Sequence, residues 1–335
     1  MPEMTDFFAD TTELSQTASA IDDALRSLRV SGSLLLAGHY AAPWAVAVPD
    51  VVELRGLLGL AEDIHVATFH LVEYGHCEIK SQRAAAVLLK AGDMAICFGG
   101  ASHRLAVGKP VEPQSFVHLL SHRRNRRHPS AGERATGTSL LCGVFLLRHA
   151  ELNPLLAALP PLLHTTLSRS GALHNLSGVG RLLAEEVART ASGSGYVIER
   201  LLEVLCAEAI RAHAEAAPRH VAGWFRGIKD RVAGRAIAAI HADPGTDWSV
   251  PKLARAVSMS PSRFSARFTE SVGDSPMAYV AKWRMNVACR KLAASRVSVE
   301  QIATEVGYES HAAFNRAFKK LVGVSPSAWR ARATA

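Results

Sequence analysis

Two stretches near the C-terminus repeat each other and decide the fold of that region: SVPKLARAVSMSPSRFSARFTESVGDSPMAY at residues 249–279 and SVEQIATEVGYESHAAFNRAFKKLVGVSPSAW at residues 298–329. Each copy carries two phenylalanines four residues apart, Phe264 and Phe268 in the first and Phe314 and Phe318 in the second. Each copy then reaches the same turn, VGDSP or VGVSP. Because a spacing of four residues places apolar side chains on one helix face, the repeat predicts two similar helical units.

Local chemistry predicts that each copy is a helix-turn-helix. Ser298 stands at an N-cap position, and Gln301 completes a capping box with it. Gly307 suits the turn that follows, because glycine readily adopts the left-handed backbone conformation. The second helix then starts at Ser260, ahead of a proline, in the first copy and at Ser310 in the second.

A duplicated unit of this kind is expected to bind double-stranded DNA through the helix faces that lie opposite the phenylalanines. Arg316 can bind a guanine edge and Asn315 an adenine edge, although an arginine can also be merely solvated on a helix surface. The predicted DNA-binding residues are Ser260, Ser262, Arg263, Ser265 and Ala266 in the first copy and His311, Ala312, Asn315, Arg316 and Lys319 in the second.

Residues 277–294, between the two copies, are predicted to form one helix of about 27 Å, at about 1.5 Å per residue. A rigid spacer of that length can place two recognition helices in successive major grooves, about 34 Å apart. We expect Trp283, Val287 and Leu292 to be its core contacts. The basic side chains expected to be free for DNA phosphates are Lys282, Arg284, Arg290 and Lys291.

The net charge of +8 is concentrated in the last third of the chain. Residues 229–335 contain 17 Lys and Arg against 8 Asp and Glu, whereas the rest of the chain has a net charge of −1. A basic domain joined to a neutral one is typical of polyanion binding, with membranes and acidic partners as alternatives. The five cysteines are scattered and never paired as CxxC, which argues against a disulfide framework or a zinc finger. With no membrane span and no secretory signal in the sequence, we expect a cytoplasmic protein.

The N-terminal part consists of short apolar runs, for example HVATFHLVEYG at residues 65–75, that predict strands of a barrel or sandwich. Residues 118–137 interrupt these runs with an arginine-rich loop, which is either a solvated tip or an auxiliary DNA contact. Helical periodicity begins near residue 153 and predicts a hairpin that covers the barrel or pairs two copies. The predicted domains are a segment at 1–30, a mainly-β barrel at 31–150, a helical hairpin at 151–214, a linker at 215–228 and an all-α double helix-turn-helix at 229–335.

From about residue 231 to residue 329 the chain resembles the AraC/XylS family of bacterial transcription regulators. The second copy carries the motif of that family in order, with Ile302-Ala303, Gly307-Tyr308, Phe314, Phe318, Gly323 and Ser325-Pro326. The resemblance implies a DNA-binding domain with recognition helices at residues 261–272 and 310–322. The first of these helices lacks a long hydrogen-bond donor at its centre, so DNA shape or phosphate contacts are expected to dominate there.

The N-terminal part resembles, more loosely, the cupin sensing domain of one AraC subgroup. The segments that carry this resemblance include TFHLVEYGHCEI at residues 68–79 and AGDMAICFGGASHRL at residues 91–105. It implies a double-stranded β barrel that holds a small-molecule effector or a metal. His39, His70, His103 and Cys142 lie at motif positions of this subgroup, and such a set suits Zn or Cu. A redox-responsive Cys142 and hydrogen-bonded core residues are the alternatives.

Three functions are therefore in view. We expect a transcription regulator that is not an enzyme, is a homodimer on DNA and recruits or blocks RNA polymerase. A cupin metalloenzyme with a fused nucleic-acid module is less favoured, because no His-x-His motif with a glutamate on the same strand is present. An architectural DNA binder without an effector is the third.

Overall fold

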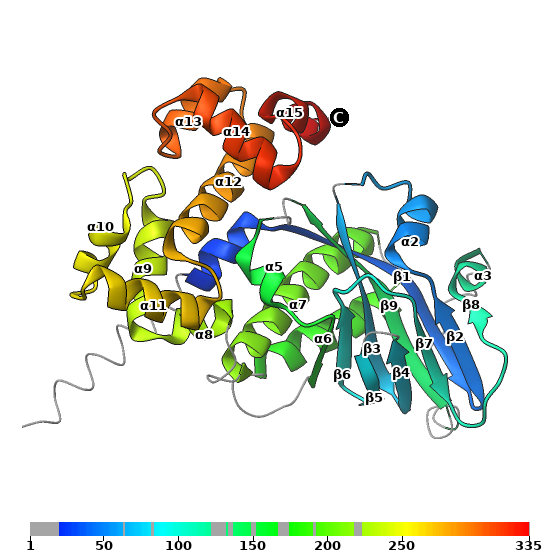
Figure 1. Ribbon diagram of the computed structural model, residues 1–335. Coiled ribbons are helices and arrows are strands. Elements are labelled where there is room, and N and C mark those ends of the chain that lie inside the picture. The colour runs from blue at the N-terminus through cyan, green and yellow to red at the C-terminus, as the bar shows by residue number, and fades with distance from the viewer. Residues whose placement is uncertain are drawn as a thin grey trace, which may run out of the picture. The chain divides into compact units, whose positions relative to one another are not determined.

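The computed structural model describes residues 20–62, 64–81, 84–121, 132, 137–148, 152–166, 174–189, 192–217 and 223–334 (Figure 1). The chain forms two compact units. The barrel unit comprises Val30–Arg148 and Leu159–Ala216, and the helical unit comprises Met1–Arg29, His149–Ala158 and Ala217–Ala335. The expected pair of a mainly-β and an all-α region is thus present, but the chain enters the helical unit three times.

Ten strands form two five-stranded sheets in the barrel unit, ordered β1-β9-β3-β6-β10 and β5-β4-β7-β2-β8. Of the strand pairs whose register is known, only β2 with β8 is parallel. The strands are β1 Arg29–Ala41, β2 Trp44–Val48, β3 His65–Tyr74, β4 His76–Ser81, β5 Ala84–Lys90, β6 Asp93–Cys97, β7 His103–Val107, β8 Gln114–Ser115, β9 Gly137–Arg148 and β10 Leu162–Thr166. Two short helices, α2 Val51–Leu58 and α3 Phe116–Ser121, complete the barrel.

The central strands β3 and β9 are buried on both faces, which explains their nearly unbroken apolar sequences. One face looks into the barrel and includes Val72, Cys142 and Val144. On the opposite face the rings of Phe69 and Phe145 stack 4.7 Å apart. The barrel interior is therefore an apolar core, and any polar group inside it needs a partner.

Two helices, α6 His174–Ala188 and α7 Ser194–Ala216, form the predicted hairpin. They pack against each other, and α7 also contacts β9 and β10. Leu183 on α6 and Leu202 on α7 are fully buried. The hairpin therefore covers one sheet of the barrel, which is one of the two roles expected for it.

The helical unit contains the double helix-turn-helix. Its elements are α5 Pro154–Ala158, α8 Trp224–Lys229, α9 Arg231–Ala242, α10 Val250–Ala256, α11 Pro261–Val272, α12 Pro276–Ala294, α13 Val299–Glu305, α14 His311–Val322 and α15 Pro326–Thr334. The pairs α10/α11 and α13/α14 are the two predicted copies, with α12 between them (Figure 1). The turn inside each copy needs a left-handed residue, which is Gly307 with φ 84° in the second copy and Ser258 with φ 56° in the first.

Helical residues 20–27 and α5 belong to the helical unit although both lie far from it in sequence. Asn153 joins them, because its Nδ2 donates to the carbonyl of Ala24 at 2.8 Å and to the hydroxyl of Ser27. Its Oδ1 accepts the backbone N–H groups of Leu155 at 2.9 Å and Leu156 at 3.3 Å. One buried amide thus caps α5 and holds residues 20–27 against it.

A second buried network ties residues 20–27 to α9 and α12. The indole N–H of Trp224 donates to the hydroxyl of Tyr279 at 2.9 Å, so this hydroxyl donates in turn to Nε2 of His241 at 2.8 Å. The Nδ1 proton of His241 then faces the carboxylate of Asp23 at 3.6 Å. The His241 ring also stacks on Trp283, with centroids 3.6 Å apart. Burial lowers the pKa of His241, which keeps the ring neutral.

Several local expectations differ from the structure. Residues 215–228 were expected in a linker, but residues 224–228 belong to α8, because Trp224 and Phe225 find buried positions in the helical unit. The hydroxyl of Ser298 accepts the N–H of Gln301 at 3.1 Å, yet the Gln301 side chain bonds Glu305 instead of closing a capping box. Most of the arginine-rich loop at 118–137 lies outside the described residues.

Three of the four basic side chains of α12 that were expected to meet phosphates are engaged by groups of the protein, although Lys282 and Lys291 stay 44% and 42% exposed. Lys282 pairs with Asp274 at 2.8 Å, and Lys291 pairs with Glu305. Arg284 donates to two backbone carbonyls, of Pro244 at 2.9 Å and of Thr246 at 2.8 Å. Arg290 is partly buried. The core positions Trp283, Val287 and Leu292 are buried as predicted.

Candidate functional site

The two predicted reading helices expose one face each and bury the other. Phe264 and Phe268 of α11 are 0% exposed, as are Phe314 and Phe318 of α14. Their rings pack at 5.7 Å in α11 and 5.6 Å in α14, so the buried faces of the two copies are nearly identical. Each helix ends at a left-handed glycine. The repeated phenylalanines therefore fix which residues of each helix stay at the surface.

The outer faces of α11 and α14 carry the residues that sequence reasoning singled out. Asn315 is half-buried, and its amide bonds the His311 ring at 3.2 Å across one helical turn. Ser265 is likewise half-buried. The other eight residues are exposed, namely Ser260, Ser262, Arg263, Ala266, His311, Ala312, Arg316 and Lys319. All ten are thus accessible on the reading faces, apart from the partial cover of Ser265 and Asn315.

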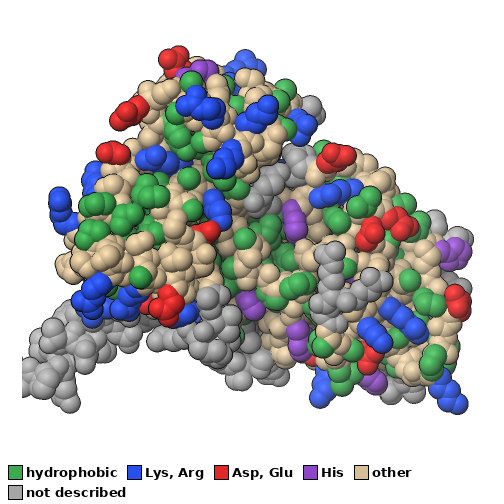
Figure 2. Space-filling view, viewed as in Figure 1, with side chains coloured by type: hydrophobic (Ala, Val, Ile, Leu, Met, Phe, Trp, Pro, Cys, Tyr) green, Lys and Arg blue, Asp and Glu red, His purple; other side chains and the backbone are tan. Residues whose placement is uncertain are grey.

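Basic side chains accompany these faces. Lys319 and Lys320 are exposed in the last turn of α14 and Arg263 in the first turn of α11. Arg267, by contrast, pairs with Asp230 at 3.0 Å and is less available for another anion. Figure 2 shows Lys and Arg side chains, in blue, over the part of the molecule where Figure 1 places α13, α14 and α15. Positive charge beside exposed donors suits the phosphates and base edges of a nucleic acid.

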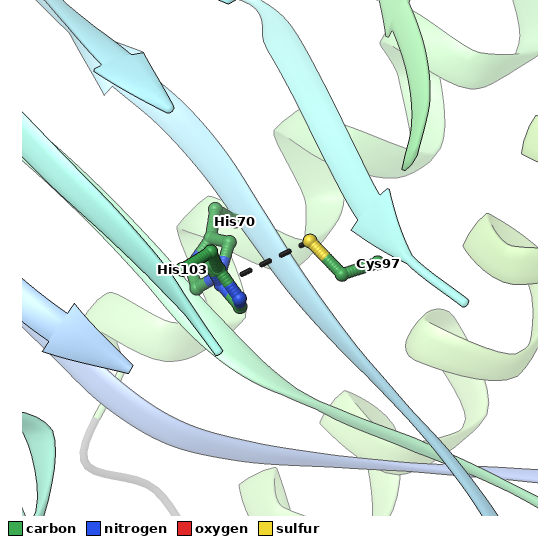
Figure 3. Close-up of side chains that lie close together, drawn as sticks. All are labelled: His70, Cys97 and His103. Atoms are coloured by element: carbon green, nitrogen blue, oxygen red, sulfur yellow. Dashed lines mark hydrogen bonds between the residues drawn. The ribbon is translucent and has the colours of Figure 1, made fainter. Parts of the chain in front are cut away.

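A second cluster lies inside the barrel unit, where His70, Cys97 and His103 meet (Figure 3). They come from β3, β6 and the start of β7. The two Nε2 atoms of the histidines are 2.7 Å apart, and Sγ of Cys97 is 3.8 Å from Nε2 of His103. All three ligand atoms lie within 4.8 Å of one another. Two histidines of the set predicted for metal binding are therefore brought together.

Burial keeps this cluster neutral. It lowers the pKa of His70 well below the usual value and also lowers that of His103. The same effect raises the pKa of the Cys97 thiol to about 12. An uncharged pair of imidazoles beside a protonated thiol is therefore the state of the protein alone.

The other two residues of the predicted metal set lie elsewhere. Nδ1 of His39 bonds the hydroxyl of Ser139 at 2.9 Å. Cys142 pairs with His70 across β3 and β9, but its sulfur does not join the cluster among the described residues. Burial raises the pKa of Cys142 well above that of a free thiol, so it lacks the thiolate character of a redox-reactive cysteine.

Cys97 was missed as a candidate, although the sequence carried a signal for it. It stands six residues before His103 in the same AGDMAICFGGASHRL segment. On β6 it pairs with Thr68 of β3, two residues before His70, so alternation along β3 places it on the same face as His70. Strand register places both Cys97 and Cys142 on the face of His70, but among the described residues only the sulfur of Cys97 joins the cluster.

Comparisons with known proteins match both halves of the chain. A family model described as "Cupin" matches residues 20–215, and one described as "Helix-turn-helix domain" matches residues 253–332. Among the described residues, none of the helices is sufficiently long and apolar to cross a bilayer.

Two relatives illustrate the similarity. An AraC-like transcription regulator of Streptomyces lividans is 32% identical over 54% of this chain, a stretch that spans only 59% of the relative. The HTH-type transcriptional regulator AlkR of Acinetobacter baylyi is 30% identical over 81% of this chain and 89% of its own length. The solved DNA-binding domain of AdpA in complex with a target DNA is 30% identical, over 29% of this chain and 87% of that one, with a TM-score of 0.28. With a TM-score this low, the structural likeness carries no argument beyond the sequence identity.

Proposed function

The chain belongs to the AraC-type family of transcription regulators, and we propose that its exposed helices α11 and α14 read a specific DNA sequence while the cupin domain senses a signal. The relatives compared above are named as transcription regulators, which agrees with the function expected from the sequence. One observation carries the proposal for the reading helices: two copies bury matching phenylalanine pairs and leave donors such as Arg316 exposed.

The test separates base reading from phosphate attraction. Genome-wide mapping of bound sites supplies a target, and binding to single-base variants of that target is then measured at fixed salt. Arg316→Ala should lose about 1–3 kcal/mol at one base position and little at the others, because a bidentate arginine reads one guanine. Lys319→Ala should weaken binding to specific and random DNA alike. Arg226→Ala is the matched control, because this arginine is paired with Glu270 at 2.8 Å.

Equal losses on specific and random DNA for Arg316→Ala would contradict base reading. An architectural binder gives that result, and it also fails to prefer its mapped sites over bulk DNA in competition.

We also propose that the protein pairs with a second copy through the α6/α7 hairpin. Val197 and Val204 are 41% and 46% exposed and lie seven residues apart, on one face of α7. Leu182 of α6 adds a third exposed apolar side chain. A twofold dimer would present two copies of the double helix-turn-helix to repeated half-sites on DNA. Val204→Glu should yield monomers in sedimentation, whereas Val52→Glu, at a more exposed valine of α2, should leave the assembly unchanged.

RNA polymerase is the second partner proposed. The proposed location is the cytoplasm, because bacterial DNA and RNA polymerase are found there. Transcription from a mapped promoter in a purified system tests this, because added protein should raise or lower transcript yield. Equal yields with and without bound protein would contradict it.

A further inference from the structure

We propose that His70, Cys97 and His103 bind one Cu(I) ion, and that this ion is a signal sensed by the cupin domain. The sensing role rests on the proposed regulatory function, whereas the binding site stands on its own geometry. The site uses Cys97 in place of His39 and Cys142, which the sequence had suggested.

The distances suit a three-coordinate ion after one small adjustment. Metal–nitrogen and metal–sulfur bonds of about 2.0 and 2.3 Å at a trigonal centre place nitrogen and sulfur about 3.8 Å apart and two nitrogens about 3.5 Å apart. The separation of Cys97 Sγ from His103 Nε2 is already 3.8 Å. The two histidine nitrogens, at 2.7 Å, must separate slightly, because without metal they share a hydrogen bond. Entry of the ion replaces that bond, and the shared proton moves to Nδ1 of His70, so the ring stays neutral and its Nε2 lone pair faces the ion.

Hydrogen bonding already prepares His103 as a ligand. Its Nδ1 lies 3.2 Å from the carbonyl of Ala101, to which it can only donate. That bond places the proton on Nδ1 and leaves the Nε2 lone pair directed at the cluster, as in many metal-bound histidines. His70 then supplies the shared proton from Nε2, and its buried Nδ1 has no partner among the described residues.

Charge and softness select Cu(I). Thiolate and imidazole together favour soft monovalent copper, and three protein ligands complete its coordination. Binding transfers the Cys97 proton to solvent, so a Cu⁺ ion and one thiolate leave the buried site neutral. Zn(II) in the same three ligands would leave one uncompensated positive charge in an apolar core, which is costly.

A small surface pocket reaches the cluster at Cys97. Cys97 and Ala101 both line it, together with Pro49, Val51, Leu54, Val66, Thr68 and Gly100. Cys97 is 7% exposed as a whole residue, whereas His70 is 1% exposed. Copper delivered from this pocket would meet Cys97 first and the two histidines next.

The binding test uses the purified full-length protein without oxygen. Cu(I) is titrated in competition with a chromophoric Cu(I) chelator, and native mass spectrometry gives the stoichiometry. We expect one ion per chain, with affinity lowered about 100-fold or more in Cys97→Ala and His103→Gln, because each removes one ligand of three. His39→Gln and Cys142→Ala are the matched controls and should retain the wild-type affinity. X-ray absorption should show two nitrogens and one sulfur around the copper.

Failure to bind Cu(I), binding undiminished in Cys97→Ala, or a copper site without sulfur would overturn the proposal. The wild-type stoichiometry and absorption spectrum do not depend on any variant folding correctly. Excess Zn(II) should not displace the copper, and displacement would assign the site to zinc instead. Promoter binding measured on the metal-free protein tests the regulatory function separately, because Arg316 belongs to the helical unit and the cluster to the barrel unit. Promoter binding unaffected by Cu(I) would remove the sensing role and leave the metal site intact.

Discussion

Two asparagines of the helical unit, Asn153 and Asn286, are each 1% exposed, yet their surroundings are opposite. The amide of Asn153 makes four hydrogen bonds, whereas neither polar atom of the Asn286 side chain has a partner among the described residues. The same truncation to alanine should therefore have opposite consequences at the two sites.

The expected magnitudes follow from these contacts. Asn153→Ala removes the cap of α5, which contributes about 1 kcal/mol. It also leaves buried groups such as the Ala24 carbonyl without this hydrogen-bond partner, which costs about 1–3 kcal/mol. The free energy of unfolding should fall by about 2–4 kcal/mol in total. Asn286→Ala removes a buried amide that costs about 1–3 kcal/mol and leaves a small void that costs about 1 kcal/mol. The net result should lie between no change and a gain of about 2 kcal/mol.

Urea unfolding followed by tryptophan fluorescence measures both variants, since Trp224 and Trp283 lie in the same unit. Hydrogen exchange adds a local readout, because the Leu155 amide should lose protection in Asn153→Ala only. Equal destabilisation by the two substitutions would refute the reasoning, since it would mean that burial alone, and not hydrogen bonding, sets their contributions.

Three further predictions concern the same unit, and each is measured by urea unfolding. Gly307→Ala should lower the free energy of unfolding by about 2 kcal/mol or more, because φ is 84° and a Cβ would meet a backbone carbonyl at 2.7 Å. Ser258→Gly should leave the free energy of unfolding unchanged or raise it by up to about 1 kcal/mol. A lower value for Ser258→Gly would contradict backbone strain at φ 56°. Burial lowers the pKa of His241, so the unfolded chain binds the proton more readily than the folded one. Stability should therefore be complete above about pH 6.5 and decline as the pH falls below that value. His241→Phe should flatten this pH dependence, and an unchanged profile would assign the dependence to other groups. Ser298→Ala should lower the free energy of unfolding by about 1 kcal/mol, whereas Ser260→Ala should hardly change it. Of these two hydroxyls, that of Ser298 accepts a capping N–H and that of Ser260 does not. Equal losses would show that the cap position alone matters.

Much of the helical unit was predictable because its information is local. Phe264 and Phe268, their counterparts in α14, and the cap and turn residues specify each helix within a few residues of sequence. The predicted recognition helix at residues 261–272 coincides with α11. The protein contacts of the basic residues of α12 were not predictable in the same way: Arg284 bonds carbonyls near residue 245, and periodicity does not reveal such contacts.

The barrel was less predictable because its contacts depend on pairing between distant strands. The apolar run at residues 65–75 located β3, whereas in β4 polar residues alternate with Cys77 and Ile79. A strand with only one buried face gives a weaker signal than a central strand. Of the predicted metal set, His70 and His103 meet, whereas His39 and Cys142 do not join them among the described residues, and metal binding itself stays a prediction.

The placement of residues 20–27 and α5 in the helical unit has a practical meaning for dissecting this protein. A fragment cut at residue 217 would contain every helix of the duplicated motif, yet it would leave behind Asn153 and the Asp23 carboxylate that faces His241. Side chains sealed by those pieces would then meet water, which favours aggregation. A minimal fragment that folds as in the whole chain must therefore include residues 20–27 and α5, either as added peptides or fused to it. The reason is that this folded unit is built from segments that are not contiguous in sequence.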